Sequence, residues 1–237
     1  MGRIHNIEGK KNKMDSLRSS AFTKHARNIT VAARMGGGDP AYNASLKLAI
    51  DKAKADNMPN DNINRAIKKG IGATDGENYE HITYEGYGPS GVALIIECLT
   101  DNKNRTAGNV RHYLDKFGGN LGTAGCVSFM FERKGALAID KKACPMSEDE
   151  LMELVLEAGA EDFASEDTHY EIITTPDDYA GVREAIEANN IPLISGEITM
   201  LPANYTEVPE ENQKAMQKLL DALEADDDIQ NVYSNMQ

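Results

Sequence analysis

The sequence predicts an α+β protein in which an N-terminal three-helix domain is followed by two α/β domains, the last inserted into the middle one. Apolar residues at helical spacing, separated by turns, occupy residues 16–70. Residues 135–205 carry strand and helix signals in the order β-α-β-β-α-β. The segments 79–134 and 206–237 are each incomplete and would together make one compact domain. We therefore expect domains of residues 1–78, of 79–134 plus 206–237, and of 135–205.

Three amphipathic patterns predict the helices of the first domain. The first helix begins near Ser16, and the second begins after Asp39, an N-cap followed by proline, and ends near Asn57. The third is expected over residues 60–69, with Gly70 as the residue that ends it. The apolar face of the first helix is expected to consist of Phe22, Ala26, Ile29 and Ala33.

Three consecutive glycines, Gly36 to Gly38, separate the first two predicted helices. A phosphate-binding glycine loop normally follows a strand, whereas this run follows a helix. We expect Gly36 to adopt the left-handed conformation that ends the first helix. Because the Asp39 carboxylate would also repel a phosphate, the run favours a joint between helices over a phosphate cradle.

The middle domain is predicted from runs of β-forming residues separated by turn residues. Strands are expected at residues 82–88 and 92–100, followed by a helix at 102–117. The segment "CVSFMFER", residues 126–133, is expected to be a further strand. A helix after Pro209 and a last strand, "IQNVYS", complete the set.

The acidic third domain begins with a separate predicted strand over residues 136–140. Its first helix opens with a capping box formed by Ser147 and Glu150. A strand over residues 170–174 precedes the second helix, for which Thr175 is the expected N-cap. This order of elements is that of a split βαβ, ferredoxin-like unit.

The net charge of −13 hides a division between the two ends of the chain. Residues 1–76 carry 14 Lys or Arg against 7 Asp or Glu, while residues 77–237 carry 11 against 31. A basic N-terminal region on an acidic chain favours a polyanion partner that is held at one end, although a solvated surface gives the same balance.

The cysteines and the hydropathy pattern indicate a cytoplasmic protein without a membrane partner. No apolar run approaches the length of a membrane span. The three cysteines, Cys98, Cys126 and Cys144, are widely spaced and lack a C-x-x-C motif. They fit free thiols in a reducing compartment.

Catalytic and metal-binding patterns are missing from the sequence. The histidines fall in different predicted elements without metal-ligand spacing, and Cys98 lies in an apolar strand. The glycines of "GGNLGTAG", residues 118–125, follow a helix, which favours a tight loop over a phosphate-binding one. The acidic run at residues 226–228 lacks an EF-hand pattern and is expected to be a solvated helix end. We expect no enzyme activity, no cofactor and no metal.

Basic residues of the first domain indicate a nucleic-acid-binding face. The third helix presents Asn and Arg, which can read base edges, and Lys, which mostly meets phosphate. A short turn before it is loosely similar to a helix-turn-helix, but its lysines would equally stabilise the helix end. The candidate binding residues are Lys24, Arg27, Arg34, Lys47, Lys54, Asn64, Arg65, Lys68 and Lys69. Lys103, Arg105 and Arg111 could extend this face, unless residues 101–106 only cap their helix.

Three long segments resemble the YebC/PmpR family. They are "ITVAARMGGGDPAYNASLKLAIDKAKADNMPNDNINRAIKKG", "YEGYGPSGVALIIECLTDNKNRTAGNVRH" and "GGNLGTAGCVSFMFERKG". The resemblance implies a helical domain and two ferredoxin-like α/β domains, the last inserted into the middle one. Family members include bacterial proteins described as transcriptional regulators and a mitochondrial activator of cytochrome c oxidase subunit I translation. The family's usual Trp-containing opening is replaced here by "GRIHNIEGKKNKM".

Two functions follow as hypotheses from the resemblance and the charge division. The first is a non-enzymatic, DNA-binding regulator of transcription, which a short helix rich in Asn and Arg favours. The second is a translation factor that binds ribosomal RNA or tRNA on the ribosome. The acidic residues 77–237 favour this second hypothesis, because basic proteins would be their neighbours on a ribosome. An adaptor that binds basic proteins through the acidic domain is a third hypothesis.

Overall fold

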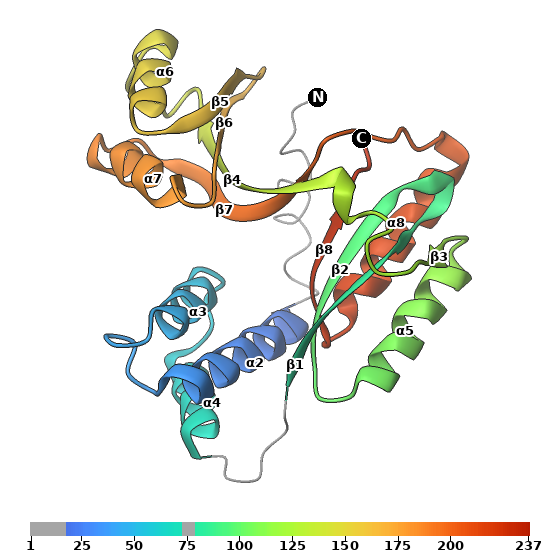
Figure 1. Ribbon diagram of the computed structural model, residues 1–237. Helices are drawn as coiled ribbons and strands as arrows, with labels where there is room; N and C mark the ends of the chain where they lie inside the picture. Colours follow the sequence, from blue (N-terminus) through green and yellow to red (C-terminus); the bar gives the residue numbers. More distant parts are fainter. Residues whose placement is uncertain (1–17, 73–78) are drawn as a thin grey trace. The chain divides into compact units, whose positions relative to one another are not determined.

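The computed structural model describes residues 18–72 and 79–237, which form helices and two four-stranded antiparallel sheets (Figure 1). The described residues divide into two compact units. One contains Phe129–Tyr205, and the other contains the residues up to Ser128 together with Thr206–Met236. The predicted α+β class and the helical N-terminal region are confirmed. The predicted bounds of three domains stay a prediction, and the predicted start of the first helix near Ser16 lies outside the described residues.

The helical region consists of α2 (Arg18–Gly36), α3 (Ala44–Ala55) and α4 (Asn60–Gly72). Its core contains residues from all three helices, including Ile29, Leu46 and Ile63. The face predicted for the first helix is confirmed: Ile29 and Ala33 are buried, while Phe22 and Ala26 pack against the same core.

Asn43 closes the joint between α2 and α3. Its amide donates to the carbonyls of Ala32 (2.8 Å) and Gly37 (2.9 Å), and its side-chain oxygen accepts from the Leu46 N–H (3.0 Å). The prediction of Asp39 as N-cap was wrong, because Asn43 takes that role and α3 begins at Ala44. Gly37, with φ +86°, takes the left-handed conformation that was expected of Gly36. One side chain therefore satisfies the end of one helix and the start of the next.

Gly70 does not end α4, contrary to the prediction, since the helix continues to Gly72. It lies where α4 crosses α2, and a Cβ placed on it would be 2.5 Å from the Thr30 carbonyl oxygen and 2.8 Å from the Ala33 Cβ. The Thr30 hydroxyl adds a hydrogen bond of 3.2 Å to the Ala66 carbonyl. The glycine is thus required by close packing between two helices, a reason that is visible only in three dimensions.

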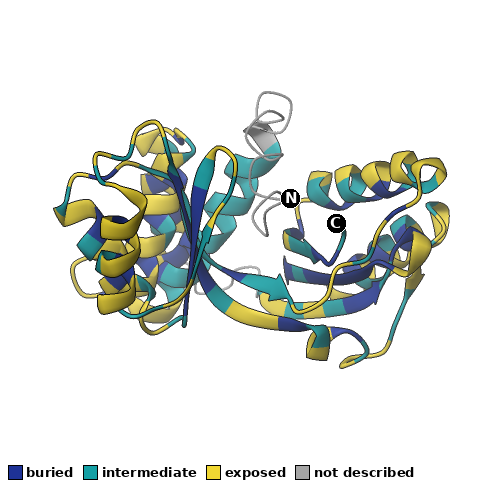
Figure 2. Cartoon of the chain, turned by 90° about the horizontal axis from the view of Figure 1, so that it is seen from above, coloured by how far each residue is buried: buried dark blue, intermediate teal, exposed yellow. Residues whose placement is uncertain are grey.

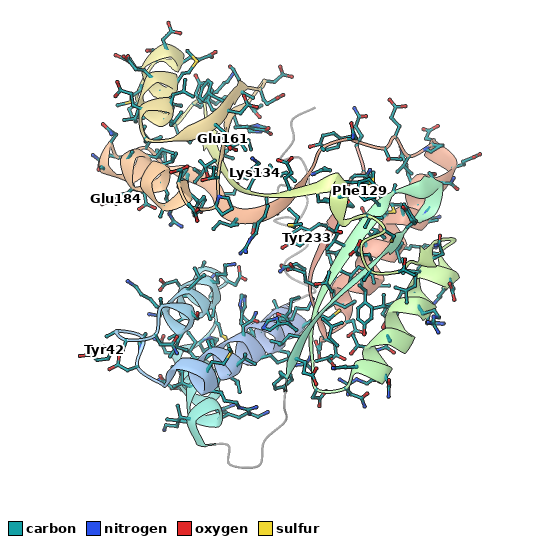
Figure 3. The ribbon with its side chains drawn as sticks, viewed as in Figure 1. Tyr42, Phe129, Lys134, Glu161, Glu184 and Tyr233 are labelled. Carbon is teal, nitrogen blue, oxygen red and sulfur yellow. The ribbon has the colours of Figure 1, made fainter. Side chains whose placement is uncertain are left out.

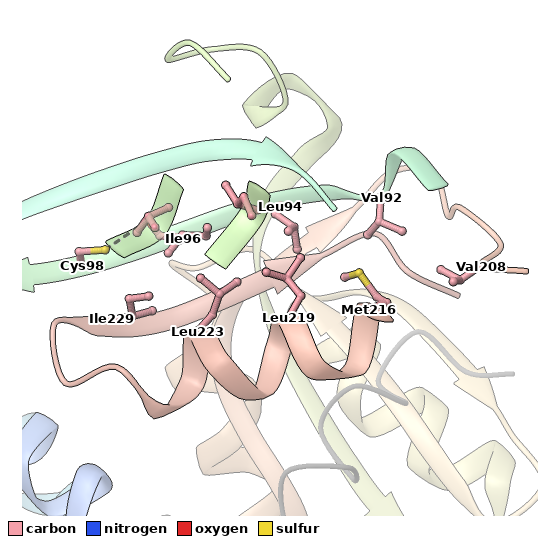
Figure 4. Packing of buried hydrophobic residues seen from close by; sticks show 11 residues of the cluster. Val92, Leu94, Ile96, Cys98, Val208, Met216, Leu219, Leu223 and Ile229 are labelled. Carbon is pink, nitrogen blue, oxygen red and sulfur yellow. Dashed lines mark hydrogen bonds between the residues drawn. The ribbon is translucent and has the colours of Figure 1, made fainter. Parts of the chain in front are cut away.

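The first sheet has the strand order β3-β1-β2-β8, with α5 and α8 on one face. Figure 4 shows Leu219 and Leu223 of α8 packed against Leu94 and Ile96 of β2. The elements are β1 (Glu80–Tyr87), β2 (Ala93–Thr100), α5 (Lys103–Lys116), β3 (Asn120–Leu121), α8 (Glu210–Ala225) and β8 (Ile229–Ser234), with a 3₁₀ turn at Pro89–Gly91.

The strand predicted at residues 126–133 is not formed as such. Ser128–Met130 is a 3₁₀ turn, and β4 then runs without a break from Phe131 to Asp140. Gly135, in the middle of β4, lies against the side chains of Thr174 and Tyr179, where no Cβ would fit. Close packing against these two side chains therefore requires a glycine at this position. The two predicted strands are one strand, β4, which pairs with β7 along its length.

The second sheet has the order β5-β6-β4-β7, which a split βαβ unit requires. The capping box of Ser147 and Glu150 is present at α6. By contrast, α7 begins after Asp178 rather than after Thr175, whose hydroxyl accepts from the Asp178 N–H. The elements of this sheet and its helices are β4 (Phe131–Asp140), α6 (Glu148–Glu157), β5 (Ala160–Ser165), β6 (His169–Thr174), α7 (Tyr179–Ala188) and β7 (Leu193–Pro202).

Burial follows the layers in both units: the strands are largely buried or intermediate, and the helices expose one face (Figure 2). Among the described residues, no helix is both long and apolar enough to cross a membrane.

The substitution Gly70→Ala tests the crossing of α2 and α4. We expect it to lower the free energy of unfolding by about 1–3 kcal/mol, because the new methyl group would overlap the Thr30 carbonyl. Gly72→Ala is the matched control, since a Cβ there meets no atom within 4 Å. Thermal and urea unfolding measure both variants, and an equal effect of the two would contradict the packing role of Gly70.

Candidate nucleic-acid interface

The outer faces of α3 and α4 carry the exposed cations of the helical region. On α3, Leu46, Ile50 and Ala53 turn inward, which leaves Lys47 and Lys54 exposed. On α4 the inward residues are Ile63, Ala66 and Gly70, and the exposed ones include Asn64, Arg65, Lys68 and Lys69. Residues 44–72, which contain both helices, carry six Lys or Arg and three Asp or Glu, a net charge of +3. The two helices therefore present a cationic surface, which we call the α3–α4 face: Lys47, Lys54, Asn64, Arg65, Lys68 and Lys69.

The polarity of α4 bears on what this face can recognise. In a helix-turn-helix, the N-terminal residues of the second helix enter the major groove. Here the first turn of α4 carries Asp61, which phosphates would repel, whereas Arg65, Lys68 and Lys69 lie further along the helix. The geometry therefore suits contact with a phosphate backbone better than reading of base edges by the helix start.

Three other predicted cations are engaged inside the protein. Lys24 Nζ donates to the Glu224 carbonyl at 2.7 Å. Arg27 donates to the carbonyls of Leu99 and Asp227 and to the Asp228 carboxylate, the last at 2.6 Å. Arg105 reaches the same carboxylate at 2.8 Å. These three side chains join α2 and α5 to the corner between α8 and β8, so we leave them out of the α3–α4 face.

Asp228 was expected to be part of a solvated helix end, and this was wrong. The residue is 3% exposed and accepts hydrogen bonds from Arg27, Arg105 and the hydroxyl of Thr106. Burial alone would raise the pKa of the Asp228 carboxyl, but the hydrogen bonds from Arg105, Arg27 and Thr106 outweigh it and lower the pKa. The carboxylate is therefore held in its charged form between two guanidinium groups.

The neighbours of Asp228 extend this contact. Ser20 donates to the Asp227 carboxylate at 2.9 Å, and Asn28 donates to the Gln230 side chain at 2.9 Å. Asn109 and Tyr113 of α5 both donate to the Asp226 carboxylate. The acidic run is thus a polar anchor for two helices.

The remaining predicted residues are not counted in the α3–α4 face, although the Arg34 backbone lies close to Gly70 of α4. Arg34 is half-buried in the last turn of α2. Lys103 pairs with Glu80, and Arg111 is exposed on α5. Asn102 is the N-cap of α5, which accounts for the polar start of this helix without any ligand.

The glycine loop after α5 is organised around a carboxylate of the protein itself. Buried Glu85 accepts from the N–H groups of Gly125, Val127 and Ser128 at 2.7–2.9 Å. Burial would raise the pKa of Glu85, but these backbone donors outweigh it and lower the pKa. Within the glycine run, the Gly125 N–H donates to the Glu85 side chain, and the N–H groups of Gly118, Gly119 and Gly122 donate to backbone carbonyls, which supports the tight-loop interpretation.

Neither a reactive cysteine at position 98 nor a metal site is supported by the described residues. Cys98 is buried against α5 and α8, and burial raises the pKa of its thiol to about 12, which disfavours the nucleophilic thiolate. Among the described residues, no group of three His, Cys, Asp or Glu side chains is placed to hold a metal.

Tyr42 is a surface feature that the sequence-based prediction missed. It is 89% exposed, and nearby Met35 is 84% exposed. Tyr42 precedes the true N-cap of α3, and a hydrophobic residue there usually packs against the fourth helical residue, which is Lys47 in this chain. Because the sequence analysis placed the N-cap at Asp39, it did not identify Tyr42 as the residue before the N-cap or its lack of an apolar partner at Lys47.

Comparison with known proteins finds relatives along nearly the whole chain. A family model described as TACO1/YebC protein N-terminal domain matches residues 2–73, and one described as TACO1/YebC second and third domain matches residues 79–236. A probable transcriptional regulatory protein of Clostridioides difficile is 60% identical over 236 residues, covering 99% of this chain and 98% of the relative. Another, from Geobacillus thermodenitrificans, is 54% identical over 231 residues, covering 98% and 94%.

A solved structure is also similar. The crystal structure of a conserved hypothetical protein from Aquifex aeolicus matches with a TM-score of 0.80 and 44% identity, over 95% of this chain and 93% of that one. The N-terminal match begins at residue 2, so it includes the opening segment that lacks tryptophan.

The substitution Asp228→Asn tests the anchor between the helices and the α8–β8 corner. We expect a loss of about 2 kcal/mol or more in the free energy of unfolding at neutral pH, because two guanidinium groups lose their buried counter-charge. The lowered pKa means that the carboxylate stabilises the fold above its ordinary value of 3.8, and that this contribution is lost as the pH falls through the lowered pKa.

The difference between wild type and Asp228→Asn should therefore shrink on acidification, as measured by urea unfolding at several pH values. Asp227→Asn is the control, because this neighbouring side chain is exposed and the amide oxygen of Asn can still accept from the Ser20 hydroxyl. A difference that stayed constant with pH would contradict the charged anchor.

Proposed function

The chain belongs to the TACO1/YebC family, and from this premise we propose that it is a non-enzymatic regulator of gene expression that binds nucleic acid. The carrying observation is the cationic α3–α4 face on an otherwise acidic chain. Lysine and arginine on adjacent helices neutralise successive phosphates and release counterions, which supplies affinity for any nucleic acid.

Transcriptional regulation through DNA is the first form of this proposal. It is supported by the names of the relatives, which are probable transcriptional regulatory proteins. Asn64 and Arg65, both exposed on α4, are the residue types that read adenine and guanine in a major groove. In this form Lys68 and Lys69 would position the helix on the phosphate backbone.

Regulation of translation through structured RNA is the second form. It is favoured by the position of Asp61 in the first turn of α4, which disfavours insertion of the helix start into a groove. Structured RNA is recognised largely by shape and backbone, which a cationic face without base-reading geometry can provide. On a ribosome, the unit of residues 129–205 could face basic proteins, because residues 135–205 carry 3 Lys or Arg against 16 Asp or Glu. Either role would place the protein in the cytoplasm.

Replacing Arg65 and Lys68 together with Gln tests the α3–α4 face. We expect weaker binding of duplex DNA and a slope of log affinity against log salt that is smaller by up to ~1.8, at ~0.9 per phosphate contact. A double variant with Lys214→Gln and Lys218→Gln on α8 changes the net charge equally and should keep the wild-type slope, since it lies outside the face. Fluorescence anisotropy over a range of salt measures both, and equal slopes would remove α4 from the interface.

A second experiment separates the two forms of the function. A transcription regulator should prefer a specific site over random duplex by at least ~10³-fold at physiological salt. A translation factor should instead sediment with ribosomes and leave them as salt rises, because cation–phosphate contacts weaken with ionic strength. Crosslinked lysates on sucrose gradients, together with selection of bound duplexes, give both readouts. Sedimentation away from ribosomes with a selected duplex favours DNA, and the reverse result favours RNA.

A further inference from the structure

Tyr42 lies at the tip of the connection between α2 and α3, with its side chain directed away from the helices (Figure 3). Four of the large apolar side chains exposed in the described residues belong to the helical region: Met35, Tyr42, Leu48 and Ile71. Isolated exposed apolar residues are common on protein surfaces. Tyr42 differs because its backbone is fixed on both sides.

The fixation comes from Asp39 and Asn43. The Asp39 carboxylate accepts from the Ala41 N–H at 2.9 Å, and its carbonyl accepts from the Tyr42 N–H at 3.2 Å. Asn43 follows directly, and its side chain is hydrogen-bonded to both α2 and α3. The backbone that carries the ring therefore loses little conformational entropy on binding, which is one part of a pre-organised contact.

The charge around the ring indicates the kind of partner. Lys47 follows in the first turn of α3, and Lys54 lies further along the same helix. Gly38 of the connection lies against Ile67 and Ile71 of α4, the helix that carries Lys68 and Lys69. The one carboxylate within the connection, that of Asp39, accepts from the Ala41 N–H. A purely apolar partner would leave these cations without counter-charges, whereas a polyanion with flat apolar groups would satisfy both features. Nucleic acid with an unstacked base is such a partner, because its phosphates meet Lys and its base stacks on an aromatic ring.

We propose that Tyr42 is a stacking platform for an unpaired base of RNA, positioned beside the phosphate contacts of the α3–α4 face. This inference rests on the proposed function and specifies RNA with unpaired bases as the nucleic acid that the α3–α4 face binds. Bases inside a duplex are stacked on both sides and offer no free face to a ring. Loops and bulges of structured RNA present unstacked bases, and sequence-specific RNA recognition targets such positions.

The experiment uses the full chain and three RNA probes: a hairpin with an unpaired loop, the same hairpin with abasic loop nucleotides, and the fully paired stem. Wild type should prefer the first hairpin over the other two. Tyr42→Ala should weaken binding of that hairpin by at least about fivefold and leave the abasic hairpin unchanged. Tyr42→Phe, which keeps the ring, should bind as wild type does, and the salt dependence should be the same for all three proteins, since no phosphate contact is altered.

A second variant reports stacking directly. The chain contains no tryptophan, so Tyr42→Trp places a single indole fluorophore at the tip. Its emission should be quenched by the looped hairpin and not by the abasic one. Quenching that is equal for both hairpins, or affinity unaffected by Tyr42→Ala, would overturn the stacking platform while wild-type binding of RNA still supported the proposed function. If wild type bound none of the RNA or DNA probes, the proposed function itself would be overturned.

Discussion

The buried carboxylate of Asp228 is the interaction on which the arrangement of the helical region against the first sheet depends. It accepts from Arg27 of α2 and from Arg105 of α5, two residues that are separated from it by more than a hundred positions in the chain. Removing one member of a buried ion pair destabilises a fold more than replacing the whole pair with apolar residues does. Without Asp228, both guanidinium groups would remain partly desolvated and without their counter-charge. Since α3 and α4 are packed on α2, the anchoring of α2 also anchors the cationic surface that the other helices present.

A second constraint acts at the opposite end of α2. Asn43 satisfies carbonyls at the end of that helix and an N–H at the start of α3, groups that a helix cannot pair by itself. Gly37 supplies the positive φ of the turn, and Gly36 has its Cβ direction filled by the Asn43 side chain, so both glycines serve the same joint. The backbone of the short connection is thereby held by hydrogen bonds on both sides of Tyr42, which fixes the position from which its exposed side chain projects.

Local patterns were sufficient for the features that depend on neighbours in the chain. The apolar stripe of α2, the capping box at Ser147 and the strand order of the second sheet were predictable because periodicity, caps and turns are read over a few residues. Gly70 and Asp228 were misjudged for the opposite reason, and β4 was divided into two predicted strands on either side of Gly135. Each is explained by a partner distant in sequence: a crossing helix, a neighbouring strand with its helix, and two arginines. From the sequence alone, a glycine is interpreted as a turn former and an aspartate as a solvated charge. Neither interpretation predicts contacts with residues that are distant in the chain.

The same limit applies to the candidate site, and it has a functional consequence. Lys24, Arg27 and Arg105 cannot be distinguished in the sequence from Lys47, Arg65 and Lys68. The first three donate to carbonyls or carboxylates of the protein, Arg105 while 44% exposed, and the second three are exposed on the α3–α4 face. The positive charge left for a polyanion is therefore smaller than the composition implies, and few phosphate contacts give limited affinity with a shallow salt dependence. Discrimination among nucleic acids then has to come from contacts whose strength does not depend on charge. In the proposed function, the Tyr42 ring beside a small cationic face would meet that requirement, because base stacking persists at salt concentrations that screen lysine from phosphate.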